Sequence, residues 1–204
     1  EGLSFNYKNN CEILYPAIKS LKKFPKKEKI IIFTGKLNSS KGYDIFGKAA
    51  LKILNQFKDW KAYAIGNERR EVHSFKHKNY KILNWLPHYK ILNFYKKSSI
   101  SVVCSRWQEP FGRTAMESAA YGCATITSNR GGLSETFNTN LVLKNLNSSS
   151  LEKIIKKIIL NNKVLKNIQN ANFKNVVHQI DFLVHKIDNL KGNFLQKKIN
   201  YIKN

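Results

Sequence analysis

Two glutamates, Glu109 and Glu117, flank a segment whose residue types could bind a sugar and a phosphate together. Pro110 and Gly112 shape a loop, and a helix is predicted from about Arg113, so its first backbone N–H groups are free to bind phosphate. The carboxylates cannot bind that phosphate, but they can accept hydrogen bonds from hydroxyl groups such as those of a ribose. The spacing alone leaves open the alternative that they are an ordinary loop acid and an ordinary helix acid.

The elements that must position this segment alternate between strand and helix. Apolar and β-branched runs predict strands at 29–35, 62–66, 80–83, 100–105, 124–128 and 141–143. Helices are predicted at 43–57, 88–97 and 113–121, and a capping box from Ser149 to Glu152 predicts another that reaches about Leu160. Helix is predicted again from Phe173 onward, with Gly192 as a candidate break. This order indicates an α/β fold, a Rossmann-like parallel sheet flanked by helices, with a C-terminal helical extension; ligands of such sheets lie at the carboxyl ends of the strands.

The composition excludes several classes of protein. The chain has 204 residues, of which 42% are hydrophobic, so it can bury a core and is not a disordered tail. Its three cysteines form no CxxC pair, which excludes a disulfide scaffold and fits a reducing compartment. No apolar run approaches a membrane span, and no signal peptide opens the chain. Because it begins with Glu1 and not Met, we expect a fragment or a processed product.

The net charge of +23 suggests a nucleic-acid partner at first sight. Only five of the 36 basic residues are Arg, however, and base-reading contacts favour Arg over Lys. The lysines are spread along the whole chain, and Asn and Ile are also abundant, as A+T-rich codons would produce. We therefore expect no nucleic-acid partner, while peripheral association with an anionic membrane stays open.

The segment from Glu109 to Glu117 resembles the E-x7-E signature of the family-4 (group 1) retaining glycosyltransferases. Those enzymes have the GT-B fold, two Rossmann-like domains with a cleft between them, and their C-terminal domain binds the nucleotide-sugar donor. Further segments resemble the family's motifs in the same order, over about Lys29 to Glu135: Gly35–Gly42 the G-R-L-x3-K-G loop, Leu83–Pro87 the stretch before the next helix, Val102–Ser105 the end of the preceding strand, Tyr121–Ala124 the A-x-G-x-P segment and Gly131–Glu135 the G-G-x-x-E segment.

The resemblance implies the catalytic residues. Lys36 and Lys41 would neutralise the donor diphosphate, in a loop framed by Gly35, because the leaving group gains negative charge as the glycosidic bond breaks. Glu109 would hold hydroxyls of the transferred sugar. Lys36 stands where the family usually has Arg, which keeps the charge but loses the bidentate fork.

The resemblance also implies the donor-binding residues. The ribose hydroxyls would lie on Glu117, and Asn84 and Trp85 would lie near the base. The backbone N–H groups offered to the sugar and diphosphate would be those of Phe111, Gly112, Arg113 and Thr114. Arg130 would face the acceptor, or else be a surface residue. No metal and no cofactor beyond the nucleotide sugar is expected, because side-chain cations and a helix N-terminus carry the phosphate charge.

The resemblance divides the chain into three parts: 1–27 an interdomain linker or N-terminal segment, 28–172 the nucleotide-sugar-binding domain, and 173–204 a helical extension that would pack on a missing N-terminal domain. The whole enzyme would move a sugar from a UDP- or GDP-type donor to a glycan or lipid-linked acceptor in cell-envelope polysaccharide synthesis, in the cytoplasm at the inner face of the membrane. The alternatives are a non-catalytic basic Rossmann-like module that binds nucleic acid or an anionic surface, and a UDP-sugar epimerase of the same fold.

Other residues are better explained as structural. His73 and His77 have the i, i+4 spacing of a metal pair, but they lie in a polar region without further ligands. The three tryptophans are interpreted as core or loop-packing residues, and Cys104 and Cys123 as small core residues.

Overall fold

The computed structural model describes residues 14, 16–18, 21–136, 141–174 and 183–193. Ser20–Val177 form one compact unit, and Glu1–Lys19 together with His178–Asn204 form a second. In the second unit residues 183–193 are helical, and this helix continues through Gly192, so the candidate break there is wrong. Most of the predicted linker lies outside the described residues, as does the rest of the C-terminal extension after Lys174.

The larger unit is built on a six-stranded sheet with the strand order β3-β2-β1-β4-β5-β6. Every neighbouring pair is parallel; Ile32 of β1, for example, lies between Tyr63 of β2 and Ser101 of β4. The predicted parallel Rossmann-like sheet is confirmed. The strands are β1 (Glu28–Thr34), β2 (Lys61–Ile65), β3 (Tyr80–Leu83), β4 (Ser98–Val103), β5 (Ala124–Ser128) and β6 (Val142–Leu143).

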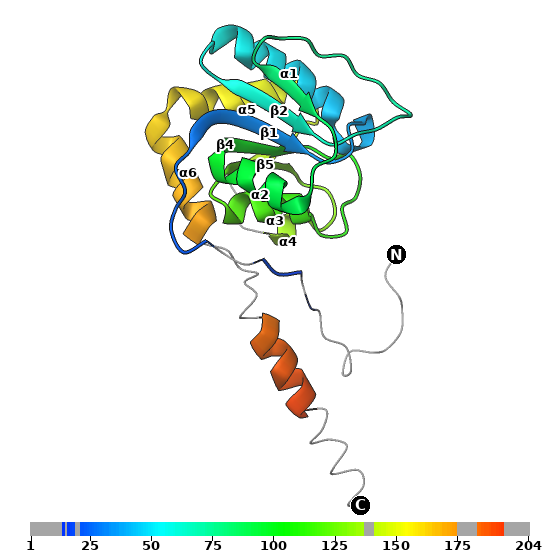
Figure 1. Cartoon of the computed structure of the whole chain (residues 1–204), viewed down its shortest axis with the longest axis vertical. Helices are drawn as coiled ribbons and strands as arrows, with labels where there is room; N and C mark the ends of the chain where they lie inside the picture. Colours follow the sequence, from blue (N-terminus) through cyan, green and yellow to red (C-terminus); the bar gives the residue numbers. More distant parts are fainter. Residues whose placement is uncertain (1–13, 15, 19–20, 137–140, 175–182, 194–204) are drawn as a thin grey trace, which may run out of the picture. The chain divides into compact units, whose positions relative to one another are not determined.

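Helices cover both faces of this sheet, α1 and α5 on one face and α2 and α3 on the other (Figure 1). Their bounds are α1 (Tyr43–Gln56), α2 (His88–Lys97), α3 (Arg113–Ala120), α4 (Leu133–Thr136), α5 (Ser148–Leu160) and α6 (Asn162–Lys174), with a short 3-10 helix η1 (Ser39–Lys41) before α1. The core beneath α1 is apolar and includes Phe33, Phe46 and Ile53, all buried. This explains why the period of apolar residues predicted α1 so closely.

The helix α6 is absent from the sequence prediction because its buried face is partly polar. Gln169 and Asn172 are buried, and their side-chain amides donate to the carbonyls of Ser99 (3.0 Å) and Cys123 (2.7 Å). These bonds tie α6 to the sheet, yet they interrupt the apolar period from which a helix is predicted.

The capping box predicted for α5 is wrong. Asn147 is the N-cap, and its Oδ1 accepts from the backbone N–H of Ser150 at 2.8 Å. Asn is as good an N-cap as Ser, and here it comes two residues before the predicted one. Glu152 instead pairs with Lys52 of α1 at 3.2 Å, which joins the two helices on this face.

The cysteines and tryptophans divide between core and surface. Cys104 and Cys123 are buried free thiols, and burial raises the pKa of Cys104 to about 12 and that of Cys123 to about 11. Trp60 is buried, as predicted, but Trp85 and Trp107 are 70% and 59% exposed, so the core interpretation is wrong for these two. No helix in the described ranges is both long and apolar enough to cross a membrane.

Candidate functional site

A cavity of about 710 Å³ opens at the carboxyl ends of β1, β2 and β3. The strand order reverses direction between β1 and β4, and such a point leaves a crevice in which α/β proteins bind their ligands. The cavity is lined by Thr34, Gly35, Lys36, Ile65, Gly66, Asn67, Trp85, Leu86, His88, Ile91, Tyr95, Arg113, Thr114 and Glu117. Six residues predicted for the site are in this set: Gly35, Lys36, Trp85, Arg113, Thr114 and Glu117. The other five predicted residues, Lys41, Asn84, Glu109, Phe111 and Gly112, are not in it, and Asn84 is exposed.

The first turn of α3 presents backbone donors to this cavity. Its N-cap, Gly112, has a φ of 99° and makes no side-chain capping bond. A side chain is disfavoured there, because L residues rarely adopt this φ and a Cβ on Gly112 would lie 2.5 Å from Cδ2 of Leu133, which would have to move. Within the described part of the chain, the N–H groups of Arg113 and Thr114 have no acceptor, and both residues line the cavity.

The loop before α3 is fixed by the turn after β5. Glu109 forms a parallel bridge with Gly131, and the N–H of Gly132 donates to the carbonyl of Glu109 at 2.7 Å. The turn needs glycine at both positions, since a Cβ on Gly131 would lie 2.3 Å from the Glu109 carbonyl oxygen and one on Gly132 2.5 Å from that of Pro110. The two sequence segments that resemble family motifs thus meet in space. The side chain of Glu135 lies outside the described residues.

Glu117 lies on α3 with its carboxylate at the cavity wall and is only 6% exposed. Its Oε1 lies 3.0 Å from Nε2 of His88 and 3.4 Å from Nη2 of Arg113. His88, the first residue of α2, is missing from the predicted site. The signal available in the sequence was its place directly after Leu86-Pro87, at the start of a helix that follows a strand end.

Lys41 and Glu109, predicted to contact different parts of the donor, are paired with each other. Nζ of Lys41 lies 2.6 Å from Oε1 of Glu109, and the two side chains are 30% and 13% exposed. Lys41 ends η1, where Oδ1 of Asn38 accepts from its backbone N–H at 3.1 Å. Gly42 follows with a φ of 78° and turns the chain into α1. The pair joins the loop after β1 to the loop after β4.

The segment after β2 also holds the loop after β1 in place. The Glu71 carboxylate accepts from the Ser39 backbone N–H at 3.0 Å and from the Ser39 hydroxyl. Both hydrogen bonds lower the pKa of Glu71, and the bond from the Ser39 hydroxyl has the larger effect. His73 Nε2 lies 2.7 Å from Glu71, and Nδ1 of His77 accepts from a backbone N–H at 3.0 Å, so each has a local structural partner. Among the described residues no group of three or more His, Cys, Asp or Glu side chains could hold a metal ion.

Tyr95 of α2 also lines the cavity, and like His88 it is missing from the predicted site. It is fully buried, and its hydroxyl bonds to that of Thr34 at the end of β1. Burial raises the pKa of Tyr95, so this hydroxyl stays protonated. The sequence predicted only an apolar helix position for it.

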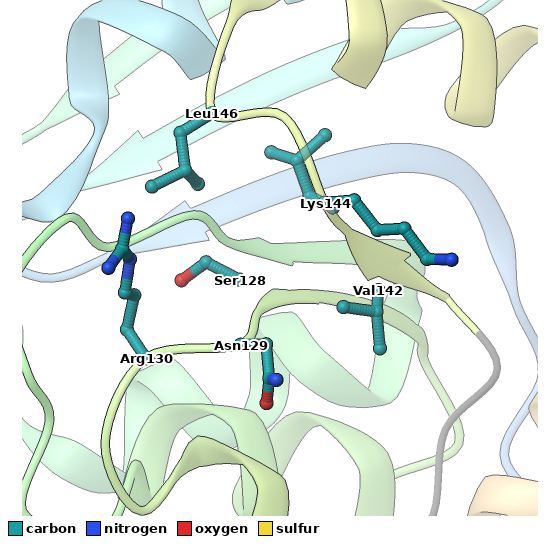
Figure 2. A pocket seen from close by; sticks show the side chains of 7 residues that line it. Ser128, Asn129, Arg130, Val142, Lys144 and Leu146 are labelled. Atoms are coloured by element: carbon teal, nitrogen blue, oxygen red, sulfur yellow. The ribbon is translucent and has the colours of Figure 1, made fainter.

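A second hollow of about 400 Å³ lies at the carboxyl ends of β5 and β6. It is lined by Ser128, Asn129, Arg130, Val142, Leu143, Lys144 and Leu146. Figure 2 shows that Lys144 extends away from Arg130, so the two cations do not converge on one point. Arg130, predicted to face an acceptor or the surface, is exposed at this hollow, which shares no residue with the larger cavity.

Comparison with known proteins places the chain in a family. The family model described as "Glycosyl transferases group 1" matches residues 16–175. The chain is 34% identical over 112 residues to an uncharacterized 42.6 kDa protein in the cps region of Klebsiella pneumoniae, a match that covers 53% of this chain and 28% of that protein.

Solved structures show the same fold. The C-terminal domain of a group 1 family glycosyl transferase (LpcC) from Francisella tularensis superposes with a TM-score of 0.68 at 21% identity, covering 79% of this chain and 96% of that domain. Anabaena HepE, in complex with UDP and glucose, gives a TM-score of 0.67 at 17% identity, covering 81% of this chain and 48% of the other. The chain thus spans about half the length of HepE, and less than half the length of the sequence relatives that it matches. It has the architecture of one half of a GT-B enzyme, and it belongs to the glycosyl transferase group 1 family.

Proposed function

We propose that this chain is the donor-binding half of a retaining glycosyltransferase that moves a sugar from a nucleoside-diphosphate sugar to a glycan or lipid-linked acceptor. The observation that supports this most is the cavity, because Lys36, the first turn of α3 and Glu117 all border it. A cation, free N–H donors and a carboxylate match the phosphate and hydroxyl groups of a UDP- or GDP-type donor. The complex of Anabaena HepE with UDP and glucose is a second support.

Each group has a separate task in this proposal. The diphosphate lies against the N–H groups of Arg113 and Thr114, where the α3 dipole and Lys36 favour negative charge. The ribose hydroxyls bond to Glu117. The base lies toward Trp85, whose 70% exposure leaves its ring free to stack.

The transfer step uses the pair of Lys41 and Glu109, which lies in the loops after β1 and β4, at the carboxyl edge of the sheet. Glu109 holds hydroxyls of the transferred sugar, and Lys41, which is 2.6 Å from Glu109, stabilises the charge that develops on the diphosphate as the glycosidic bond breaks. An oxygen of the leaving diphosphate takes the proton of the acceptor hydroxyl on the same face of the sugar, so the anomeric configuration is retained. Fixed cations and the helix N-terminus carry the phosphate charge without a metal.

The remaining parts of the enzyme belong to the same proposal. Residues 1–27 lead in from an N-terminal domain, 28–172 bind the donor, and the helical extension 173–204 packs on that domain, which supplies the acceptor site. The relative in a cps region favours a polysaccharide product of the cell envelope. The net charge of +23 suits work in the cytoplasm beside an anionic membrane.

We expect one nucleoside diphosphate to stabilise the chain. In thermal shift assays with UDP, GDP, ADP and their sugars, a ligand at about 100 times its Kd adds about 2.7 kcal/mol to the free energy of unfolding. Glu117→Gln should weaken that nucleotide's binding about tenfold in calorimetric titration, because it removes the charge that accepts the ribose hydroxyls. Glu28→Gln is the matched control, since Glu28 lies at the opposite, amino end of β1.

Two outcomes would refute this function. The first is that no nucleotide shifts the melting temperature of a cooperatively folded sample. The second is binding to DNA or RNA that falls steeply with salt and does not change in the Glu117→Gln variant, which is the behaviour of a basic nucleic-acid module.

A further inference from the structure

His88 links two helices at the mouth of the cavity. It is the first residue of α2, and its imidazole reaches Glu117 on α3, 29 residues further along the chain. Its side chain is 57% exposed, whereas that of Glu117 is 7% exposed. A solvent-facing imidazole therefore contacts a carboxylate that is otherwise enclosed by protein.

The geometry fixes which atoms share this contact. A carboxylate only accepts hydrogen bonds, so Nε2 of His88 carries the proton and donates to Oε1 of Glu117 at 3.0 Å. Arg113 approaches the same oxygen at the longer distance of 3.4 Å, from a side chain that is 66% exposed. Within the described part of the chain, no hydrogen bond reaches Oε2 of Glu117, so one carboxylate oxygen is occupied and the other is unused.

A carboxylate held through one oxygen can present the other in a fixed direction. Oε2 has two acceptor positions, which suits two neighbouring hydroxyl groups of one sugar ring. Without His88, the Glu117 side chain would be held at Oε1 only by the longer contact to Arg113, and it would lose rotamer freedom on binding at a cost to affinity.

We propose that His88 is a positioning residue that holds Glu117 through Oε1, so that Oε2 selects ribonucleotides over 2′-deoxyribonucleotides. This inference rests on the proposed nucleotide-binding function. It assigns no proton transfer to His88, since a neutral imidazole protonated on Nε2 and an imidazolium both make the bond.

The test compares the Kd values of two nucleotides by calorimetric titration of the 204-residue chain. The probes are the nucleoside diphosphate that binds most tightly among UDP, GDP and ADP, and its 2′-deoxy analogue. Wild type should prefer the ribonucleotide by about tenfold. His88→Ala should weaken the ribonucleotide about fivefold and leave the 2′-deoxy analogue within about twofold. His88→Gln, whose amide can donate to the same oxygen, should restore most of the preference.

Controls separate this role from a general effect on folding. Tyr89→Ala changes the next residue of α2, which does not line the cavity, and should alter neither Kd. Combined with Glu117→Gln, His88→Ala should have no further effect, because the two residues act through one contact. Equal weakening of both nucleotides by His88→Ala, or additive losses in the double variant, would overturn the inference while the proposed function stands. Failure of wild type to bind any nucleotide would overturn both.

Discussion

Gly42→Ala should lower the free energy of unfolding by about 3 kcal/mol, the sum of backbone strain and overpacking. Gly42 has a φ of 78°, which an L side chain rarely adopts. A Cβ there would lie 2.1 Å from the carbonyl oxygen of Cys104, which is a backbone atom directly after β4 and cannot turn aside. The strand end or the loop carrying Lys41 must then move. Chemical denaturation monitored by circular dichroism measures the loss.

Gly35→Ala is the matched control for this substitution. Gly35 also has a positive φ, 141°, but a Cβ on it would meet nothing within 4 Å. Its variant therefore has the backbone strain without the clash, and should lose about 1 to 2 kcal/mol. A loss of only about 1 kcal/mol for Gly42→Ala, the cost of the left-handed backbone alone, would show that the close approach of Gly42 to Cys104 does not exist.

Lys27→Met should lower the free energy of unfolding by about 3 kcal/mol, because two helix ends lose their hydrogen-bond donor. The Lys27 amine donates to the carbonyls of Tyr95 (2.9 Å) and Tyr121 (2.6 Å), at the ends of α2 and α3. Both helices border the candidate site, so Lys27 fixes the frame that carries Tyr95 and Glu117. Lys26→Met, at an exposed position one residue earlier, should be nearly neutral.

The effect of Lys27 should also depend on pH. Burial lowers its pKa below the ordinary 10.5, and the nearby Cys123 opposes this only in part. Between the folded-state pKa and 10.5 the unfolded chain binds more protons than the folded one, so stability rises with pH in that window. The difference between wild type and Lys27→Met should therefore widen as pH increases toward 10.5. If the stability difference between the two proteins narrows over this range, the Lys27 amine is not desolvated by burial.

The sequence patterns predicted the elements whose buried faces are apolar. Ile31 and Phe33 in β1, and Phe46 and Ile53 in α1, follow the periods of a buried strand and of an amphipathic helix. The prediction missed α6, where Gln169 bonds to the backbone of a strand 70 residues away. A polar side chain of this kind looks exposed in sequence, and only the tertiary partner shows that it is buried.

In the candidate site, too, local features could be predicted from the sequence and tertiary contacts could not. Gly35, Lys36 and Thr114 were predicted because the segments that contain them resemble motifs of a known family, and such motifs are local in sequence. His88 and Tyr95 were missed because their partners, Glu117 and Thr34, lie 29 and 61 residues away. The pairing of Lys41 with Glu109 likewise joins residues 68 apart, and no local pattern encodes it.

A crystal structure of the chain with its tightest-binding nucleoside diphosphate would test the central claim most directly. We expect the diphosphate within hydrogen-bonding distance of the backbone N–H groups of Arg113 and Thr114, and the ribose hydroxyls on the Glu117 carboxylate. A nucleotide bound instead at the hollow beside Arg130, with the first turn of α3 and Glu117 untouched, would contradict the account.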